Sequence, residues 1–364
     1  MKINIKKQPL VSTLSALQFL TKNQTTVPAL SCFLVRVDKN NGADVVVTDG
    51  NSFLVEKVEA DIVNDGCFAF PAKKLLDITR SIDSDDISIE VNDDLKATIK
   101  GDKSTFSLIV YKGEEFPPIP NVSGESFNID GSIVSNLIKS TIFSVCTDNS
   151  RPVLSGLSIK VGLNKINIAS SDGRRLSINS ADIDYDSNNL SAIIPTGTAN
   201  NFLRLLEGLD NVQLTVQENL IKFDVNYGNT VFISNLLDFI FPNLDNVIPK
   251  SFDTKIEVNR AALLSLLKRA EIVAPEKAQS VKMTWKKNSL NIFASTPAVG
   301  DFNEDLDIEY NGMPLTIYFS PIYFAEALNV IDAKEVTLCF GDESSPMMIE
   351  AGSFKHILMP MRYT

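Results

Sequence analysis

The sequence is poor in the residues from which most catalytic and metal sites are built. Its 364 residues include one histidine, His356, and four scattered cysteines, with no Cys-x-x-Cys pair. A structural zinc site needs clustered Cys or His ligands, and a disulfide framework needs regularly spaced cysteines. We therefore predict no metal, no cofactor and no disulfide, and interpret Cys32, Cys67, Cys146 and Cys339 as reduced thiols of a cytoplasmic protein.

The sequence also lacks the features of nucleotide-binding, membrane and secreted proteins. The chain has no glycine-rich phosphate loop and no run of about 18 apolar residues, so neither a nucleotide-binding loop nor a membrane helix is expected. The alternating start, Met1–Lys7, lacks the apolar core of a signal peptide. A net charge of −11 disfavours tight binding of the whole surface to nucleic acid, although a local basic surface remains compatible with it.

The carboxylates do not form a convincing catalytic cluster. Asp49 and Asp172 could be paired catalytic acids, but each precedes a glycine and is better explained as the start of a tight turn. The acidic stretches 83–86 and 93–94 are typical of solvated loops. His356 could be a general base, but it stands in an alternating run and is better explained as an ordinary strand residue. We predict that the protein is not an enzyme.

A repeat is the strongest positive feature. Pro152–Ser155 and Ser171–Gly173 echo Pro28–Ser31 and Thr48–Gly50, with offsets of 152 − 28 = 124 and 172 − 49 = 123. Such a constant spacing indicates a duplicated unit. After the Asp-Gly step the second copy continues Arg-Arg-Leu, whereas the first continues Asn-Ser-Phe. A repeat explains architecture, so we look for function in this difference.

The same order and spacing of predicted elements extends to a third unit. Helices are predicted after Pro71, Pro195 and Pro321, at offsets of 195 − 71 = 124 and 321 − 195 = 126. Each unit has an earlier helix as well, near 10–17, over 131–145 and around Leu263, Leu264 and Leu267. Alternating runs between them predict antiparallel strands. The fold class is thus α+β, with three repeated domains at residues 1–122, 123–250 and 251–364. In the third unit Ser295–Gly300 replaces the Asp-Gly turn.

Several short sequence motifs resemble those of a known family. They are Thr48–Gly50, Phe70–Lys74, Pro152–Gly156, Ser171–Leu176, Phe241-Pro242 with Ile248-Pro249, and the terminal Met359–Arg362. Because these motifs occur in this order over the whole chain, the sequence resembles the bacterial DNA polymerase III beta subunit, the sliding-clamp family. The resemblance implies three DNA-clamp domains, each with two helices packed on antiparallel sheets, and two chains joined head to tail in a ring. Such a ring encircles duplex DNA and tethers the replicative polymerase for processive DNA synthesis.

The resemblance also implies a partner-peptide cleft between the second and third domains. Its partners would be the polymerase III alpha subunit, the clamp loader and other proteins with a clamp-binding motif. Carried over position by position, the cleft residues are Leu154, Ser171, Gly173, Arg174, Arg175, Leu176, Pro242, Val247, Ser320, Tyr323, Pro346, Leu358, Met359, Pro360, Met361 and Arg362. Leu, Val, Pro and Met suit an apolar slot, and arginines at its rim can orient a peptide. The alternative is a C-terminal strand that only completes the core.

Two further surfaces follow from the resemblance. The residues implied at the dimer interface are Lys74, Phe106, Leu108, Ile272, Val273 and Glu304. The cations expected to face DNA are Lys22, Lys73, Arg80, Lys139, Arg151, Arg204 and Lys268. Phe106 and Leu108 could equally be ordinary core residues of an alternating strand.

Two other classes stay open at this point. One is a multidomain peptide-binding scaffold of the replication machinery that does not encircle DNA, which the acidic charge would suit. The other is a metal-dependent nuclease, which the lack of clustered ligands disfavours.

Overall fold

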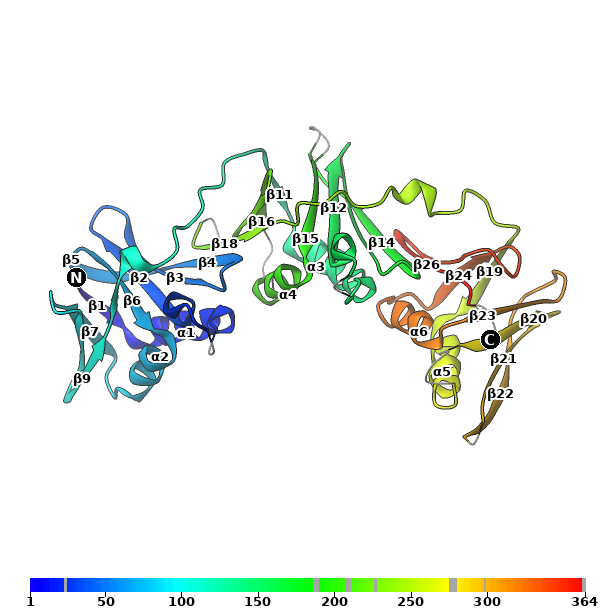
Figure 1. The fold of residues 1–364 in the computed structure, drawn as a ribbon, viewed down its shortest axis with the longest axis horizontal. Coiled ribbons are helices and arrows are strands. Elements are labelled where there is room, and N and C mark those ends of the chain that lie inside the picture. The colour runs from blue at the N-terminus through cyan, green and yellow to red at the C-terminus, as the bar shows by residue number, and fades with distance from the viewer. Residues whose placement is uncertain are drawn as a thin grey trace. The chain divides into compact units, whose positions relative to one another are not determined.

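A computed structural model describes residues 1–22, 25–148, 150–185, 190–206, 211–225, 228–274, 280–297 and 299–361. The described chain forms two compact units (Figure 1). Unit 1 comprises Met1–Gly131 and Arg204–Leu236, and unit 2 comprises Ser132–Leu203 and Leu237–Thr364. The middle repeat is thus shared, because its strands pair with strands of both neighbouring repeats.

Unit 1 contains a five-stranded sheet, β5-β1-β7-β8-β9, and a nine-stranded sheet, β10-β6-β2-β3-β4-β18-β17-β16-β11. Its helices are α1 (Lys7–Leu17) and α2 (Ala72–Ser81). Its strands are β1 (Lys2–Lys6), β2 (Cys32–Asp38), β3 (Gly42–Thr48), β4 (Ser52–Val58), β5 (Ala60–Asn64), β6 (Gly66–Pro71), β7 (Asp86–Val91), β8 (Lys96–Gly101), β9 (Ser104–Ile109), β10 (Tyr111–Lys112), β11 (Ser126–Ile129), β16 (Val212–Gln217), β17 (Leu220–Val225) and β18 (Thr230–Asn235).

Unit 2 contains an eight-stranded sheet, β15-β12-β13-β14-β26-β25-β24-β19, and a four-stranded sheet, β22-β21-β20-β23. Its helices are α3 (Gly131–Lys139), α4 (Thr196–Leu205), α5 (Arg260–Glu271) and α6 (Pro321–Asn329). The boundary with unit 1 falls after Gly131, the first residue of α3, and before Arg204 near the end of α4. Its strands are β12 (Gly156–Gly162), β13 (Lys165–Ser171), β14 (Arg175–Asp182), β15 (Leu190–Pro195), β19 (Thr254–Asn259), β20 (Val281–Lys286), β21 (Ser289–Thr296), β22 (Gly300–Asp307), β23 (Leu315–Phe319), β24 (Glu335–Phe340), β25 (Met347–Ala351) and β26 (Phe354–Leu358).

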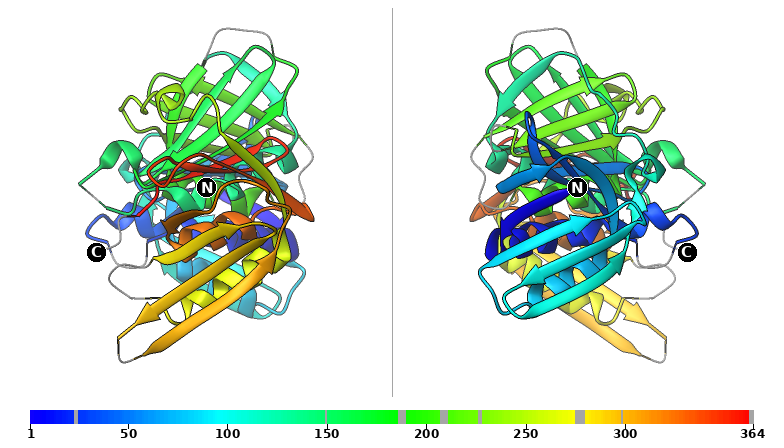
Figure 2. Two further views of the ribbon diagram at one scale, coloured as in Figure 1. Left: turned by 90° about the vertical axis from the view of Figure 1, so that its right-hand side faces the viewer. Right: turned by 90° about the vertical axis from the view of Figure 1, so that its left-hand side faces the viewer.

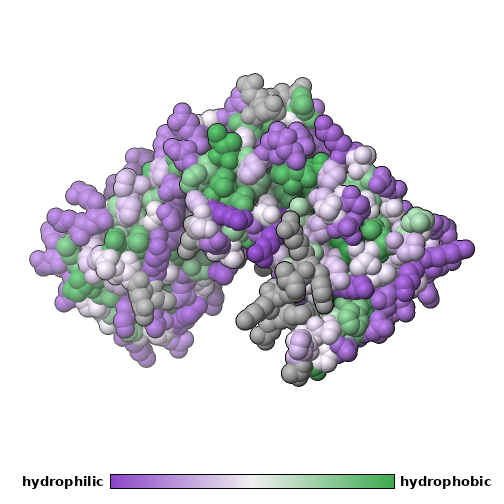
Figure 3. All heavy atoms as spheres, turned by 45° about the vertical axis from the view of Figure 1, so that its right-hand side comes forward, coloured by the Kyte–Doolittle hydropathy of each residue, from purple (hydrophilic) through white to green (hydrophobic). Residues whose placement is uncertain are grey.

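The amphipathic helices cover sheet faces, as their leucine spacing predicts. In unit 1, Leu10, Leu14 and Leu17 of α1 are at most 3% exposed, and α1 packs on α2 and β1. In unit 2, α5 packs on α6 and on strands β21 and β22 (Figure 2). On the face drawn in Figure 3, hydrophilic side chains prevail and hydrophobic ones form separate patches.

Strand pairs join successive repeats. β4 of the first repeat pairs with β18 of the second, with Phe53 opposite Ile233. β14 of the second repeat pairs with β26 of the third, with Leu176 opposite Ile357. Each sheet therefore continues across a repeat boundary, and an apolar core forms beneath the joint.

The Asp-Gly steps are structural turns, as predicted. Gly50 has φ +94° and Gly173 has φ +84°, the left-handed region that glycine adopts without a steric cost. In the second turn an Asp172 carboxylate oxygen accepts N–H bonds from Arg174 (2.9 Å) and Arg175 (3.0 Å). Asp49 accepts the equivalent pair of bonds at 2.9 and 2.7 Å. Both carboxylates are thus occupied in shaping backbone.

One predicted element boundary was wrong, and several strands were not predicted. The helix predicted over 131–145 ends at Lys139, because the hydroxyls of Ser140 and Thr141 donate back to Leu137 O at 3.1 and 2.7 Å and stop its regular continuation. Strands β6, β15, β22 and β23 were not predicted; in β22 the acidic residues outnumber the two apolar side chains, Phe302 and Leu306, that pack against the core.

Candidate functional site

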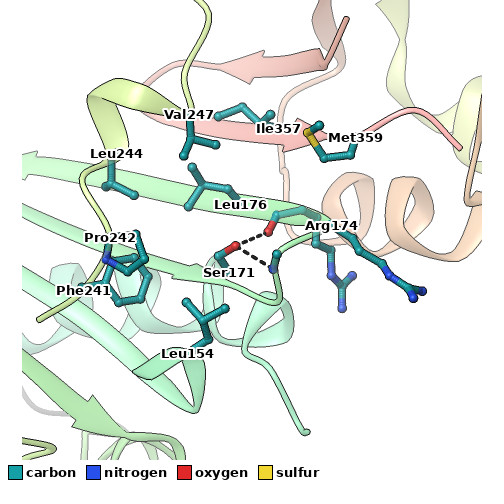
Figure 4. Close-up of a pocket in the computed structure, with 12 residues that line it drawn as sticks. Leu154, Ser171, Arg174, Leu176, Phe241, Pro242, Leu244, Val247, Ile357 and Met359 are labelled. Atoms are coloured by element: carbon teal, nitrogen blue, oxygen red, sulfur yellow. Dashed lines mark hydrogen bonds between the residues drawn. The ribbon is translucent and has the colours of Figure 1, made fainter. Parts of the chain in front are cut away.

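A pocket in unit 2 lies where β14 meets β26 (Figure 4). Its cavity volume is about 170 Å³, and an apolar cavity of about 150 Å³ is enough to bind benzene. The pocket is therefore large enough for one bulky apolar side chain. Its lining residues are Leu154, Ser171, Gly173, Arg174, Arg175, Leu176, Phe241, Pro242, Leu244, Val247, Ile357 and Met359.

Four segments build this wall. A short helical turn, Pro152–Leu154, supplies Leu154, and the Asp-Gly turn supplies residues 171–176. Ser171 holds that turn, since its hydroxyl donates to Arg175 O (2.7 Å) and accepts from Gly173 N–H (3.0 Å) (Figure 4). The stretch 241–247 forms the opposite wall, and β26 with the residue after it supplies Ile357 and Met359.

The structure brings together nine of the sixteen residues predicted for the cleft: Leu154, Ser171, Gly173, Arg174, Arg175, Leu176, Pro242, Val247 and Met359. Sequence reasoning missed Phe241, Leu244 and Ile357. Phe241 belongs to a motif that marked the resemblance, and Leu244 and Ile357 each lie two residues from one. Their apolar character was the available signal.

Six other predicted cleft residues, Ser320, Tyr323, Pro346, Leu358, Pro360 and Met361, do not line this pocket. Leu358 is 1% exposed and belongs to the core of the third repeat. Ser320 is 3% exposed and caps α6 by accepting the N–H of Tyr323. Pro346, Pro360 and Met361 are half-buried, and Arg362 lies outside the described residues.

Residues Met359–Met361 form an anchored tail that begins at the pocket wall. Met359 N–H donates to Arg174 O at 3.0 Å, and Met361 N–H donates to Tyr318 O at 2.8 Å. Met359 is 42% exposed, so its flexible thioether side chain remains accessible at the pocket mouth.

The predicted interface residues occupy two sheet edges and nearby helices. Phe106 and Leu108 are half-buried on β9. Ile272, which caps α5, is 77% exposed, and its neighbour Val273 is half-buried. Lys74 is exposed on α2. The Glu304 carboxylate on β22 accepts from Arg269 Nε at 2.9 Å within the chain, so a pair with Lys74 would have to share it.

Comparison with known proteins places the chain in a family. Residues 1–120, 128–243 and 245–362 match the models of the N-terminal, central and C-terminal domains of the DNA polymerase III beta subunit. The chain belongs to this family. It functions as a sliding clamp, as its curated relatives do. The three domain models also account for the three repeats of the sequence.

Individual relatives resemble the chain over its full length. The beta sliding clamps of Haemophilus influenzae and Pseudomonas putida are each 29% identical, with all of both chains covered. Among solved structures, the beta subunit of Pseudomonas aeruginosa is 27% identical with a TM-score of 0.93, and the sliding clamp of Bacillus subtilis is 25% identical with the same score. All of each chain is again covered.

In this clamp the guanidinium of Arg175 is hydrogen-bonded mainly to other residues of the same chain. Its side chain is 8% exposed. Nε donates to Asp172 Oδ2 at 3.0 Å, Nη1 donates to Glu326 of α6, and Nη2 donates to Phe143 O at 2.7 Å. The guanidinium also lies 4.2 Å from the ring centroid of Tyr323, a cation–π contact. By contrast, Arg174 is exposed and forms no salt bridge within the described part of the clamp.

The cations predicted to face DNA have varied surroundings. Arg151 lies next to the Asp-Gly turn, where its Nη1 donates to Asp172 O at 3.3 Å. Arg204 at the end of α4 lies 5.3 Å from the Phe19 ring, and Arg80 of α2 donates to Ser15 at 2.9 Å. Lys73, Lys139 and Lys268 are exposed on α2, α3 and α5, and Lys22 is exposed after the first helical segment.

The clamp shows no metal-binding group of three or more His, Cys, Asp or Glu side chains among its described residues. Nor does any described helix have the length and apolarity to cross a membrane.

His356 should make the clamp sensitive to acid. It is fully buried, and its Nδ1 lies 2.8 Å from Ser177 Oγ. Burial, with a smaller effect of the Arg175 cation, lowers the pKa of His356 to about 3. The unfolded chain has a histidine pKa of about 6.5 and therefore takes up the proton first. Between these two values the free energy of unfolding falls as pH falls, by at most about 1.4 kcal/mol per pH unit.

The test is the urea midpoint of unit 2 unfolding at about pH 7 and about pH 5. His356→Gln removes the only histidine in the sequence while keeping a hydrogen-bonding group for Ser177. We expect the midpoint of the variant to change less between the two pH values than that of the wild type. An equal change in both proteins would contradict a neutral buried imidazole.

Proposed function

We propose that this clamp closes as a head-to-tail homodimeric ring around duplex DNA. The supporting observation is the pattern of strand pairs at the repeat joints. The strand after the Asp-Gly turn, β4 or β14, pairs with β18 or β26 of the next repeat. These strands recur at constant offsets: β14 begins 175 − 52 = 123 residues after β4, and β26 begins 354 − 230 = 124 residues after β18.

The same offsets define a third joint. The equivalent of β14 in the third repeat is β22 (300 − 175 = 125), and the equivalent of β18 in the first repeat is β9 (230 − 104 = 126). Each is the outermost strand of its sheet in the described structure. An open strand edge is a template for pairing with another chain. Pairing β22 of one copy with β9 of another would complete the third joint, and closure of two such contacts gives a dimer.

Charge supports this pairing. Strand β22 carries Asp301, Glu304 and Asp305. On the other edge, Lys100 and Lys103 are exposed at the turn between β8 and β9. Opposite charges on the two edges favour head-to-tail contact and disfavour contact between like edges. The exposed Ile272 adds apolar area beside β22 because α5 packs on that strand.

A ring that holds DNA by enclosure needs little affinity for it. The net charge of −11 suits this mode, since tight phosphate contacts would slow sliding. We therefore assign a non-catalytic role as a processivity factor in the cytoplasm, with the polymerase III alpha subunit and the clamp loader as partners. One solved relative, the Pseudomonas aeruginosa clamp, is bound to griselimycin, so that protein takes a ligand. For this clamp we propose that the pocket of unit 2 binds an apolar side chain of a partner peptide.

Retention on DNA tests the ring. Labelled clamp loaded on nicked circular DNA should remain through gel filtration, and linearising the circle should release it. Retention that is equal on circular and linear DNA would contradict enclosure and favour a scaffold that does not encircle DNA. A strictly monomeric mass at micromolar concentration would do the same.

A further inference from the structure

The C-terminal tail is held by two carbonyl groups on different elements. Met359 N–H binds Arg174 O of the Asp-Gly turn, and Met361 N–H binds Tyr318 O of β23. β23 continues through Ser320 directly into α6. The tail therefore spans from the turn to the β23–α6 segment, and Met359 forms part of the pocket wall between these anchors.

One side chain connects the same two elements. Arg175 binds Asp172 of the turn at 3.0 Å, and it binds Glu326 and stacks on Tyr323 of α6. With a side chain only 8% exposed, Arg175 holds its charge away from water, whereas Glu326 is 40% exposed. A buried cation depends on its carboxylates, because removing one of the two leaves only the other to offset a charge that has little access to water.

We propose that the Arg175–Glu326 bridge positions the tail: it sets the separation of the Arg174 and Tyr318 carbonyls and so keeps Met359 in the pocket wall. Glu326 does not line the pocket and acts as a positioning residue, whereas Arg175 both borders the pocket and carries the bridge. Tyr323 does not line the pocket, but its ring stacks on Arg175, and Ser320 fixes the start of α6 by accepting the N–H of Tyr323. The proposal rests on the proposed function only for the nature of the ligand.

The principal variant is Glu326→Gln, which removes the charge while keeping the shape of a half-exposed side chain. A second variant, Arg175→Lys, keeps the charge but loses the fork that reaches three partners. The matched control is Asp44→Asn, which breaks the Arg36–Asp44 pair (2.8 and 2.6 Å) in unit 1. Two quantities are measured in each protein: amide hydrogen exchange at single residues, and the affinity for a fluorescein-labelled pentapeptide that ends in Leu-Phe.

We expect both bridge variants to raise the exchange rates of the Met359 and Met361 amides at least about fivefold, while the amides of β24 keep their protection. The peptide Kd should rise about three- to tenfold, and the control should match the wild type. Unchanged exchange at both tail amides overturns the proposal, as does faster exchange with an unchanged Kd. Equal loss of protection in β24 also overturns it, since that would show general destabilisation. If the wild type binds no peptide, the proposed pocket function fails, and tail exchange alone still decides whether the bridge positions the tail.

Discussion

A clamp with Ile272→Asp is expected to be monomeric at micromolar concentration and to leave circular DNA as quickly as linear DNA. Ile272 is 77% exposed in the single chain, so the substitution leaves the fold of the subunit intact. In the proposed dimer the new carboxylate would lose water beside the acidic strand β22, whose own carboxylates already take up the cations of the opposite edge. Burying an unpaired charge costs several kcal/mol, and about 2.7 kcal/mol already weakens an association a hundredfold.

Symmetry increases the effect. A head-to-tail ring of two chains contains two copies of the interface, so every variant subunit weakens both contacts. The mass is measured by sedimentation or native mass spectrometry, and retention is measured on nicked circles. Ile240→Asp is the matched control, because Ile240 is 94% exposed and was not assigned to the interface. A dimeric Ile272→Asp clamp would contradict the assignment of this surface.

The second large effect is expected from Val247→Asp, which should weaken peptide binding by about a hundredfold without opening the ring. Val247 lines the pocket and is 40% exposed, so a carboxylate there stays hydrated in the free clamp. A bound apolar side chain would strip that water away and leave the charge unpaired. The peptide Kd is measured by fluorescence anisotropy, with sedimentation to follow the dimer.

Leu163→Asp is the matched control for the pocket. Leu163 is an 81% exposed leucine in the turn between β12 and β13 of the same unit, outside the lining of the pocket at β14 and β26. The Leu163→Asp variant should bind the peptide with the same Kd as the wild type. Equal weakening in both variants would indicate a nonspecific effect of charge, and unchanged binding in Val247→Asp would place the peptide elsewhere.

The two repeat joints show why the pocket lies at the second. In the first joint, Ser52 Oγ lies 3.0 Å from Ser234 Oγ, and Phe53 packs with Phe116 and Ile233 in a core cluster. In the second joint, the equivalent positions hold Arg175, which reaches to α6, and the smaller Leu176, which lines the pocket. The contrast between Asn-Ser-Phe and Arg-Arg-Leu was visible in the sequence, and its consequence for packing was not.

Periodic and local features could be read from the chain alone. The offsets of 123 to 126 predicted the repeat, because duplicated units keep their spacing. The leucines of α1 predicted the buried face of that helix, and Asp-Gly predicted turns at Gly50 and Gly173, since only glycine adopts a positive φ without a steric cost. These properties depend on neighbours within a few residues or on a repeated pattern.

Only the tertiary structure decided which residues share the site. No spacing rule brings Glu326 to Arg175, separated by 151 residues, or places Met359 against Arg174. Nor could the sequence show that Arg174 and Arg175, adjacent in the chain, differ so much in exposure. Arg174 ends the turn and stays exposed, whereas Arg175 begins β14 and its side chain is covered by its contacts with α6. The sequence by itself determined the family, the repeat and the turn, whereas long-range packing decided which arginine is available to a partner and which one holds the pocket in shape.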